Sequence, residues 1–240
     1  MRRLIIALVA IMSIAAERPP VNGEQRETWR NGKTRSIKIY EAGLLHGVVE
    51  EFHENGEVAA RTTYKKGEKN GPASTFHENG KPLEEFLFRA GELDGPYRKF
   101  DEGGRCVEEG AYQSGVQNGP FRVYDPKGTL KQEISYAAGQ RSGDTVEYYA
   151  TGKVKARIPF RDDKEHGMAT FFHGNGKELC RVTYDAGKRH GNMSCRYRTG
   201  EPLLEETWEH GNLVRGRYWT IEGKLVHQRD SLEEGMVGIP

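Results

Sequence analysis

Residues 47–71 read GVVEEFHENGEVAARTTYKKGEKNG, and this stretch contains the pattern from which the fold can be predicted. Asn55-Gly56 separates two runs that contain β-branched and aromatic residues. Asn-Gly in this setting is a strong signal for a two-residue hairpin turn of type I′, which needs positive φ at both central residues. Gly67 and Gly71 follow the second run and suit a longer turn with left-handed backbone. The stretch therefore predicts two antiparallel strands with a turn at each end.

The same pattern recurs every 24 residues along the chain. The first glycine series is Gly32, Gly56, Gly80, Gly104, Gly128, Gly152, Gly176 and Gly200. A large aromatic residue lies eight positions after each of them, at Tyr40, Tyr64, Phe88, Tyr112, Tyr136, Phe160, Tyr184 and Trp208. A second aromatic series lies four positions before a glycine, at Phe52, Phe76, Phe100, Tyr124, Tyr148 and Phe172. Self-similarity at a fixed period of this length is typical of a solenoid or an array.

Two further glycine series mark the other turn of each unit. The first is Gly43, Gly67, Gly91, Gly115, Gly139, Gly187 and Gly211, with Asp163 in the remaining place, and the second is Gly47, Gly71, Gly95, Gly119, Gly143, Gly167 and Gly191. We see no helical period in the mature chain, so we predict an all-β fold, an elongated single-sheet array of about eight consecutive antiparallel hairpins. A single hairpin is marginal in water, so we expect neighbouring hairpins to bury the aromatic series between them.

The two ends of the chain differ from the repeats. Residues 1–16 have a basic start followed by thirteen mostly apolar residues, Leu4 to Ala16, with small residues at Ala15-Ala16. This is the layout of a secretory signal peptide, and the apolar run is too short for a transmembrane segment, which needs roughly 20 residues. We therefore expect cleavage near Ala15-Ala16 and export to the periplasm or the medium. The predicted organisation is a signal peptide at 1–16, a linker at 17–23, a repeat domain at 24–225 and a tail at 226–240.

Composition argues against several functions. Removing Arg2 and Arg3 with the signal peptide leaves 34 basic and 35 acidic residues, so the mature chain has no excess charge to attract nucleic acid. The glycines are spaced for turns, and we find neither a phosphate-binding glycine loop nor a nucleophile elbow. We expect no enzyme activity and no cofactor.

Six histidines recur at two positions of the repeat: His53, His77 and His173 at one, and His46, His166 and His190 at the other. A ladder of metal sites is one interpretation. Equivalent residues in adjacent units lie about 10 Å apart, because two strands separate them, whereas zinc holds its nitrogen ligands at about 2 Å. We therefore interpret these histidines as polar residues beside turns and predict no metal site.

The cysteine count is odd, with Cys106, Cys180 and Cys195. In an exported protein an odd number suggests one disulfide and one free thiol. Cys180 and Cys195 fall opposite or nearly opposite each other if the strands around Gly187–Gly191 pair. A disulfide between them is one prediction, and two reduced core cysteines are the alternative.

Adjacent aromatic residues offer a candidate binding surface. Tyr148-Tyr149 and Phe171-Phe172 are neighbours on strands, and neighbours on a strand point to opposite faces. One ring of each pair should then lie outside the packed series, where it could stack on a sugar of a cell-envelope glycan. The alternative is that all the rings belong to the core.

The phrase that ends in Phe52-His53-Glu54-Asn55-Gly56, with its companions Tyr64-Lys65-Lys66-Gly67 and Asn70-Gly71, resembles the variant MORN repeat of YwqK-type antitoxin proteins. The resemblance covers roughly residues 24–225. It implies an elongated sheet of consecutive hairpins used for protein interaction, and for the YwqK-like group an antitoxin or immunity role. We predict a non-catalytic module that binds a protein partner outside the cytoplasm; envelope-glycan binding and an antitoxin role are the alternatives.

Overall fold

The computed structural model describes residues 21–230, which form one open sheet of 22 strands and contain no helix. The strands are Gly23–Thr28 (β1), Thr34–Glu41 (β2), Leu44–Leu45 (β3), Gly47–Phe52 (β4), Val58–Lys65 (β5), Glu68–Phe76 (β6), Pro82–Arg89 (β7), Glu92–Leu93 (β8), Gly95–Phe100 (β9), Cys106–Gln113 (β10), Val116–Gln117 (β11), Gly119–Tyr124 (β12), Leu130–Ala137 (β13), Gln140–Tyr148 (β14), Val154–Arg161 (β15), Lys164–Glu165 (β16), Gly167–Phe172 (β17), Glu178–Asp185 (β18), Lys188–Arg196 (β19), Pro202–Glu209 (β20), Asn212–Trp219 (β21) and Leu225–Asp230 (β22). All pairings are antiparallel and follow hairpin order along the sheet, which confirms the predicted fold class.

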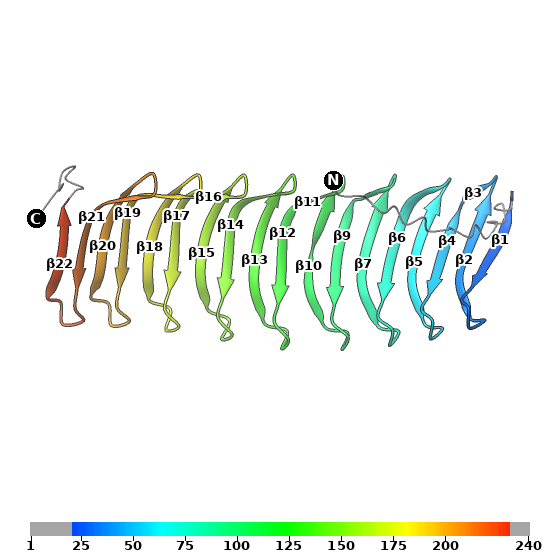
Figure 1. Cartoon of the computed structure of the whole chain (residues 1–240), viewed down its shortest axis with the longest axis horizontal. Coiled ribbons are helices and arrows are strands. Elements are labelled where there is room, and N and C mark those ends of the chain that lie inside the picture. Colours follow the sequence, from blue (N-terminus) through cyan, green and yellow to red (C-terminus); the bar gives the residue numbers. More distant parts are fainter. Residues whose placement is uncertain (1–20, 231–240) are drawn as a thin grey trace, which may run out of the picture.

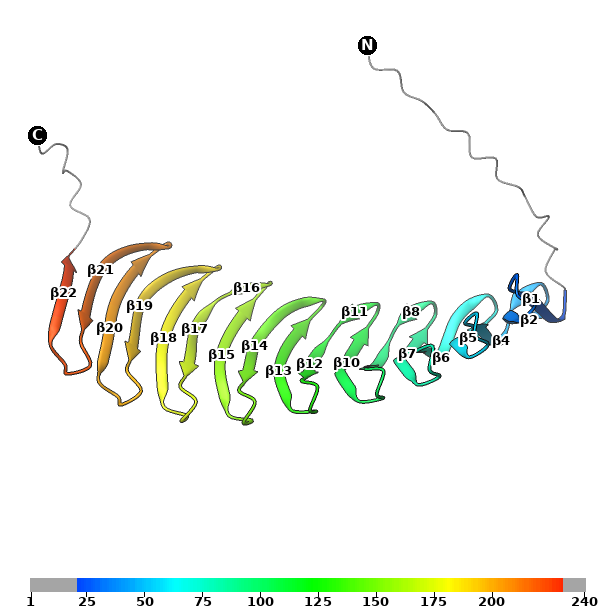
Figure 2. The same cartoon turned by 60° about the horizontal axis from the view of Figure 1, so that its bottom comes forward.

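The hairpins line up side by side into a rod, with β1 at one end and β22 at the other (Figure 1). The turned view shows that the row of hairpins follows a curve and that individual strands are bowed (Figure 2). The two-residue strands β3, β8, β11 and β16 are the first parts of β4, β9, β12 and β17, separated from them by an irregularity in the ladder.

The turn at Asn55-Gly56 is not of type I′, so the sequence prediction for this end of the hairpin was wrong. Gly56 has a φ of 95°, but Asn55 is not among the residues with positive φ. The Gly56 N–H donates to the His53 carbonyl at 2.9 Å and the His53 N–H donates to the Glu57 carbonyl at 2.8 Å. These bonds define a three-residue loop with a glycine bulge.

Asn55 serves this turn through its side chain. Its Oδ1 accepts from the Glu57 N–H at 2.8 Å, and its Nδ2 donates to the Glu78 carbonyl of the next hairpin at 2.7 Å. The role of Asn55 is therefore side-chain hydrogen bonding. The dipeptide Asn-Gly alone does not show whether the asparagine has this role or adopts a left-handed backbone conformation.

The type I′ turns occur at the opposite end of each hairpin. Lys66 and Gly67 have φ values of 54° and 85°, and they connect Lys65 to Glu68, which pair directly. Asp162 and Asp163 make the corresponding turn without glycine, at φ values of 50° and 63°. The third glycine series lies four residues after the second series, in a bulge that interrupts the ladder.

Two faces of the sheet are distinguished by burial. On the core face, Phe121 is 1% exposed, and its ring meets those of Tyr97, Tyr112 and Tyr136 at centroid distances of 6.2, 5.6 and 5.3 Å. Direct strand partners share a face, so the register assigns each pair to this core face or to the opposite, outer face. The core is one layer of side chains spread along the rod.

The second aromatic series lies on the outer face, which corrects the expectation that both series pack together. The Arg61 guanidinium lies 5.6 Å from the centroid of the Phe76 ring, and the Tyr124 hydroxyl donates to Glu109 at 2.7 Å. Arg61 and Glu109 project from the outer face. A one-residue bulge beside the Asn-Gly turn, where Glu51 pairs with Ala60 but Phe52 pairs with Val58, changes the alternation between the two series, and periodicity alone does not reveal that change.

The ordered sheet extends past both predicted domain boundaries. β1 begins at Gly23, the last residue of the predicted linker, and β22 reaches Asp230, five residues into the predicted tail. β22 pairs with β21 through Tyr218 and His227 although the 24-residue period has slipped there, because backbone pairing does not need the repeat sequence. The predicted signal peptide lies outside the described residues.

Cys180 and Cys195 are direct partners on β18 and β19 and are joined by a disulfide. Cys195 is 3% exposed, so the bond lies in the core face of the C-terminal hairpins. Cys106 is a half-buried free thiol, and burial raises its pKa. The bond connects the second strand of one hairpin to the first strand of the next.

We expect Gly110→Ala to destabilise the protein by about 1–3 kcal/mol, because a Cβ at Gly110 would lie 2.5 Å from the Phe121 ring. Gly174→Ala is the matched control, since its Cβ would meet nothing within 4 Å. Urea unfolding followed by circular dichroism measures both. Equal stability of the two variants would contradict the packing described for Phe121.

Reducing the disulfide should lower the stability of the C-terminal hairpins by about 3 kcal/mol, the chain-entropy value for a closed loop of 15 residues. Trp208 and Trp219 fluorescence in urea, with and without reductant, reports on this region. Cys106→Ser should leave the effect of the reductant unchanged. An unfolding midpoint that ignores the reductant would show that the bond does not form.

Candidate functional site

A row of alternating charges runs along the outer face across successive strands. Direct pairing links Glu50 to Arg61, Glu85 to Arg98 and Glu109 to Arg122. The ion pairs of this charged row are Glu50–Arg61 at 2.8 Å, Glu85–Arg98 at 3.8 Å, Glu109–Arg122 at 3.6 Å and Arg122–Glu133 at 2.7 Å. The glutamates and arginines are partly exposed, so each pair contributes little to stability. The row does, however, present an ordered alternation of charge.

A hydrogen bond holds Arg122 of this row in its charged form. The bond to Glu133 raises the pKa of Arg122, which therefore stays protonated. Burial and the hydrogen bond to Glu109 raise the pKa of Tyr124 to about 12, so this hydroxyl remains a donor at neutral pH. Glu109 thus meets both Tyr124 and Arg122.

An apolar row lies beside the charged row on the same face. Its members in the N-terminal half are Ile39, Val48, Thr63, Pro72, Leu87, Pro96, Ala111 and Pro120. Val48 is 42% exposed and Ile39 is 39% exposed. In the C-terminal half the same row is mixed, because Pro159 and the 54% exposed Met168 alternate with polar residues at Ser135, Asp144, Thr183 and Asn192.

The local sequence explains why proline is tolerated inside this sheet. Pro72, Pro96 and Pro120 each follow a bulge glycine, where the backbone ladder is already interrupted. Gly95 has a further role, because a Cβ there would lie 2.6 Å from Leu87 Cδ2. The glycine therefore lets the Leu87 side chain lie flat against the sheet.

The two rows enclose a shallow groove over β6 to β12. Two adjoining hollows of about 340 and 300 Å³ share Pro96, Tyr97 and Arg98. We call this feature the outer groove and define it by the residues Pro72, Leu87, Pro96, Ala111 and Pro120 on the apolar side and Glu85, Arg98, Glu109 and Arg122 on the charged side. Its long direction crosses the strands and follows the rod.

The four predicted aromatic residues do not form one exposed surface. Tyr148, Tyr149, Phe171 and Phe172 are all half-buried. Phe171 lies in the core face between Ala156 and Cys180. Tyr148 and Tyr149 line a separate hollow of about 250 Å³, and the Tyr149 hydroxyl donates to the Phe172 carbonyl at 2.6 Å.

That bond belongs to a series that connects consecutive turns, which sequence reasoning missed. Side chains at one repeat position bond the backbone carbonyl that precedes the next turn: Trp29 to Phe52, His53 to Phe76, His77 to Phe100, Tyr149 to Phe172, His173 to Arg196 and Tyr197 to Trp219. The shared feature is a ring with a polar atom, and the mixed residue types conceal it in the sequence. Among the described residues no acidic, histidine or cysteine cluster could hold a metal ion.

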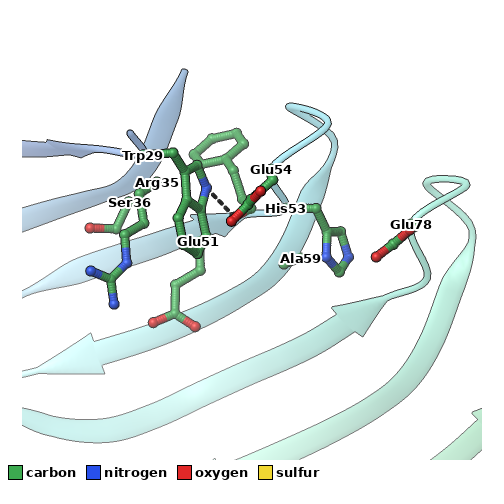
Figure 3. Close-up of a pocket in the computed structure, with 9 residues that line it drawn as sticks. Trp29, Arg35, Ser36, Glu51, His53, Glu54, Ala59 and Glu78 are labelled. Atoms are coloured by element: carbon green, nitrogen blue, oxygen red, sulfur yellow. Dashed lines mark hydrogen bonds between the residues drawn. The ribbon is translucent and has the colours of Figure 1, made fainter. Parts of the chain in front are cut away.

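Figure 3 shows the hollow at the N-terminal end of the rod, with a volume of about 540 Å³. Trp29 Nε1 donates to the Phe52 carbonyl at 3.0 Å, and the Arg35 guanidinium lies 5.1 Å from the Trp29 ring centroid. His53 and Glu78 extend from the neighbouring turns. Trp29 and His53 belong to the turn-connecting series, so this hollow is bounded by residues that hold the hairpins together.

Comparison with known proteins supports the repeat interpretation. The family model described as MORN repeat variant matches residues 45–66, 69–90, 117–138 and 141–162, which together are less than half of the chain. The YwqK-like antitoxin assignment is not among these matches. No curated protein matches the chain.

Solved structures give only weak likenesses. The crystal structure of TarM is 17% identical over 49% of this chain and 20% of its own, with a TM-score of 0.27. The crystal structure of TcdB2-TccC3 is 10% identical over 87% of this chain and 15% of its own, with a TM-score of 0.21. This chain spans a fifth or less of either structure, and both TM-scores are low.

We expect Tyr149→Phe to lower the stability by about 1 kcal/mol, because it removes the hydroxyl that bonds the Phe172 carbonyl but keeps the ring. Tyr148→Phe is the matched control and should change stability by less than about 0.5 kcal/mol. Thermal unfolding compares the two variants. A loss in the control as large as that in Tyr149→Phe would contradict the turn-connecting role.

Proposed function

We propose that this chain is a non-catalytic binding module whose outer groove receives an extended segment of a partner protein. The observation that carries the proposal is the exposed apolar row of Pro72, Leu87 and Pro96 beside an ordered row of alternating charges. Apolar surface that stays exposed next to polar side chains is typical of an interaction site. Repeat arrays bind partners along extended surfaces of this kind.

The geometry of the outer groove favours an extended protein segment over a compact ligand. The hollows of about 340 and 300 Å³ are shallow, adjoin each other and run along the rod. A segment with apolar side chains on one side and charges of both signs on the other would match the two rows. MORN repeats are generally protein- or lipid-interaction modules, and the four matched segments support a binding role.

We further propose that binding takes place outside the cytoplasm. The basic and apolar segment at 1–16 has the layout of a signal peptide. The disulfide between Cys180 and Cys195 supports this, because such bonds persist in oxidising compartments. The described residues include no helix with the length and apolarity to cross a bilayer.

No structural observation favours glycan binding or an antitoxin role over this proposal. The glycan alternative needs exposed rings, whereas Tyr148, Tyr149, Phe171 and Phe172 are half-buried. The antitoxin alternative needs a toxic protein bound in the cytoplasm, which the predicted export opposes.

We expect Leu87→Asp to abolish capture of the partner, because it places an unpaired carboxylate on the apolar side of the outer groove. In-cell crosslinking followed by mass spectrometry, on cytoplasmic, periplasmic and medium fractions, identifies the partner. Titration with the purified partner should then show a loss of affinity of at least about tenfold, or about 1.4 kcal/mol.

The matched control is Thr183→Asp, which changes the equivalent repeat position on β18, outside the outer groove. It should bind as the wild type does. An intact chain beginning at Met1 and crosslinked to a toxic protein in the cytoplasm would overturn the proposal in favour of the antitoxin alternative. Equal loss in both variants would move the binding site away from the outer groove.

A further inference from the structure

The two end strands occupy complementary positions of the repeat. β1 pairs with β2 as β4 pairs with β5: Gly23 lies opposite Tyr40 as Gly47 lies opposite Tyr64. β1 is therefore a first strand of a hairpin. β22 follows the turn that begins at Thr220, and Tyr218 lies opposite His227, so β22 is a second strand. The array thus begins with a first strand and ends with a second strand.

Direction also matches at the two ends. Every second strand inside the rod is followed by an antiparallel first strand, as β5 is followed by β6. Because strand direction alternates along the rod, β22 and β1 run in opposite directions. A second copy translated along the rod would place its β1 beside β22 in the same orientation that β6 has beside β5. Figure 1 shows the two strands at opposite ends of the rod.

We propose that copies of this chain join head to tail, with β22 of one copy pairing antiparallel with β1 of the next. The join has the geometry of the β5–β6 junction and continues the sheet from copy to copy. Such a contact uses two different surfaces and leaves a new end of each kind exposed, so it produces an open filament when the rotation between copies does not close a ring. This assembly goes beyond the proposed partner binding and does not depend on it.

The side chains at the two ends suit this join. In the β5–β6 register Ala60 lies opposite Thr75 and Thr62 lies opposite Ala73. The equivalent register sets His227 opposite Glu27 and Arg229 opposite Gln25 of the next copy. The core face of β22 therefore offers a cation and a histidine to a strand that carries a carboxylate.

Neither end strand contains proline or lysine, two of the residues that often blunt natural edge strands, in Gly23–Thr28 or in Leu225–Asp230. Leu225 and Val226 are 44% and 59% exposed. Among the described strands β1 pairs with β2 alone, and β22 with β21 alone.

The backbone of Arg26 faces the open edge of β1. The Ile39 carbonyl accepts from the His46 N–H, so the backbone at Ile39 faces away from β1. Backbone direction alternates along a strand, so Lys38 faces β1 and bonds Gln25, its partner. Arg26 then points its N–H and carbonyl outward, toward the β22 of a second copy.

Sedimentation velocity and negative-stain electron microscopy on the purified chain, over a range of concentrations, test this assembly. We expect species larger than the monomer that lengthen with concentration. Arg26→Pro should eliminate them, because it removes the outward N–H and leaves the bonds of β1 to β2 intact. Arg26→Ala should retain them, since it removes only the charge. Because Arg26→Pro keeps an intact β22, adding it in small amounts should shorten wild-type filaments.

A second pair of variants keeps the test decisive if Arg26→Pro does not fold. Gln25→Arg places a cation opposite Arg229 and should reduce assembly at least severalfold, and the double variant with Arg229→Glu should restore it. A monomer at every concentration would overturn the proposal. So would a closed dimer that Arg26→Pro does not affect, because that dimer would join two copies of β22.

Discussion

The backbone hydrogen bonds between each hairpin and the next are the interaction on which the rest of this structure depends. One hairpin of this kind has too small an apolar face to be stable in water. Here each strand finishes its pairing with a neighbour on both sides, except at the two ends of the described sheet. The aromatic rings then pack from hairpin to hairpin, as Tyr97, Tyr112 and Phe121 do, so the core is continuous although it is only one layer deep. Stability in such an array is a sum of contacts between neighbours.

The constant 24-residue period aligns equivalent side chains of successive hairpins. The left-handed turn residues fix where every strand starts and stops, so equivalent side chains fall into rows that cross the strands. One row collects alternating glutamate and arginine, and the row beside it collects proline, leucine and valine. A single exposed leucine on a sheet does not indicate a binding site. A row of apolar residues beside paired charges forms a surface that a partner can recognise. From Ser135 and Asp144 onward the row is mixed, and the two hollows that define the outer groove lie in the N-terminal half, from β6 to β12.

The turn-connecting series shows how different residues meet one structural need. Trp29, His53 and Tyr149 each direct a polar atom of an aromatic side chain to the carbonyl before the next turn. Their recurrence at one repeat position invites a metal interpretation for the histidines and a sugar-stacking interpretation for the tyrosines. The bonds account for both observations without a ligand, because a backbone carbonyl near a strand end needs a donor.

The repeat, the antiparallel hairpin order, the open array and the absence of helix from residues 21–230 could be predicted from the sequence alone, because spaced glycines and alternating strand residues are local signals. The placement of Cys180 and Cys195 on neighbouring strands could be predicted in the same way. The positions of the type I′ turns at Lys66-Gly67 and its equivalents, and the placement of Phe76 and Tyr97 on opposite sides of the sheet, depend on tertiary pairing. The faces follow from the bulge beside the Asn-Gly turn, where Ala59 is an extra residue between Val58 and Ala60. One extra residue reverses which face the following side chains take, and its position depends on pairing with the neighbouring strand.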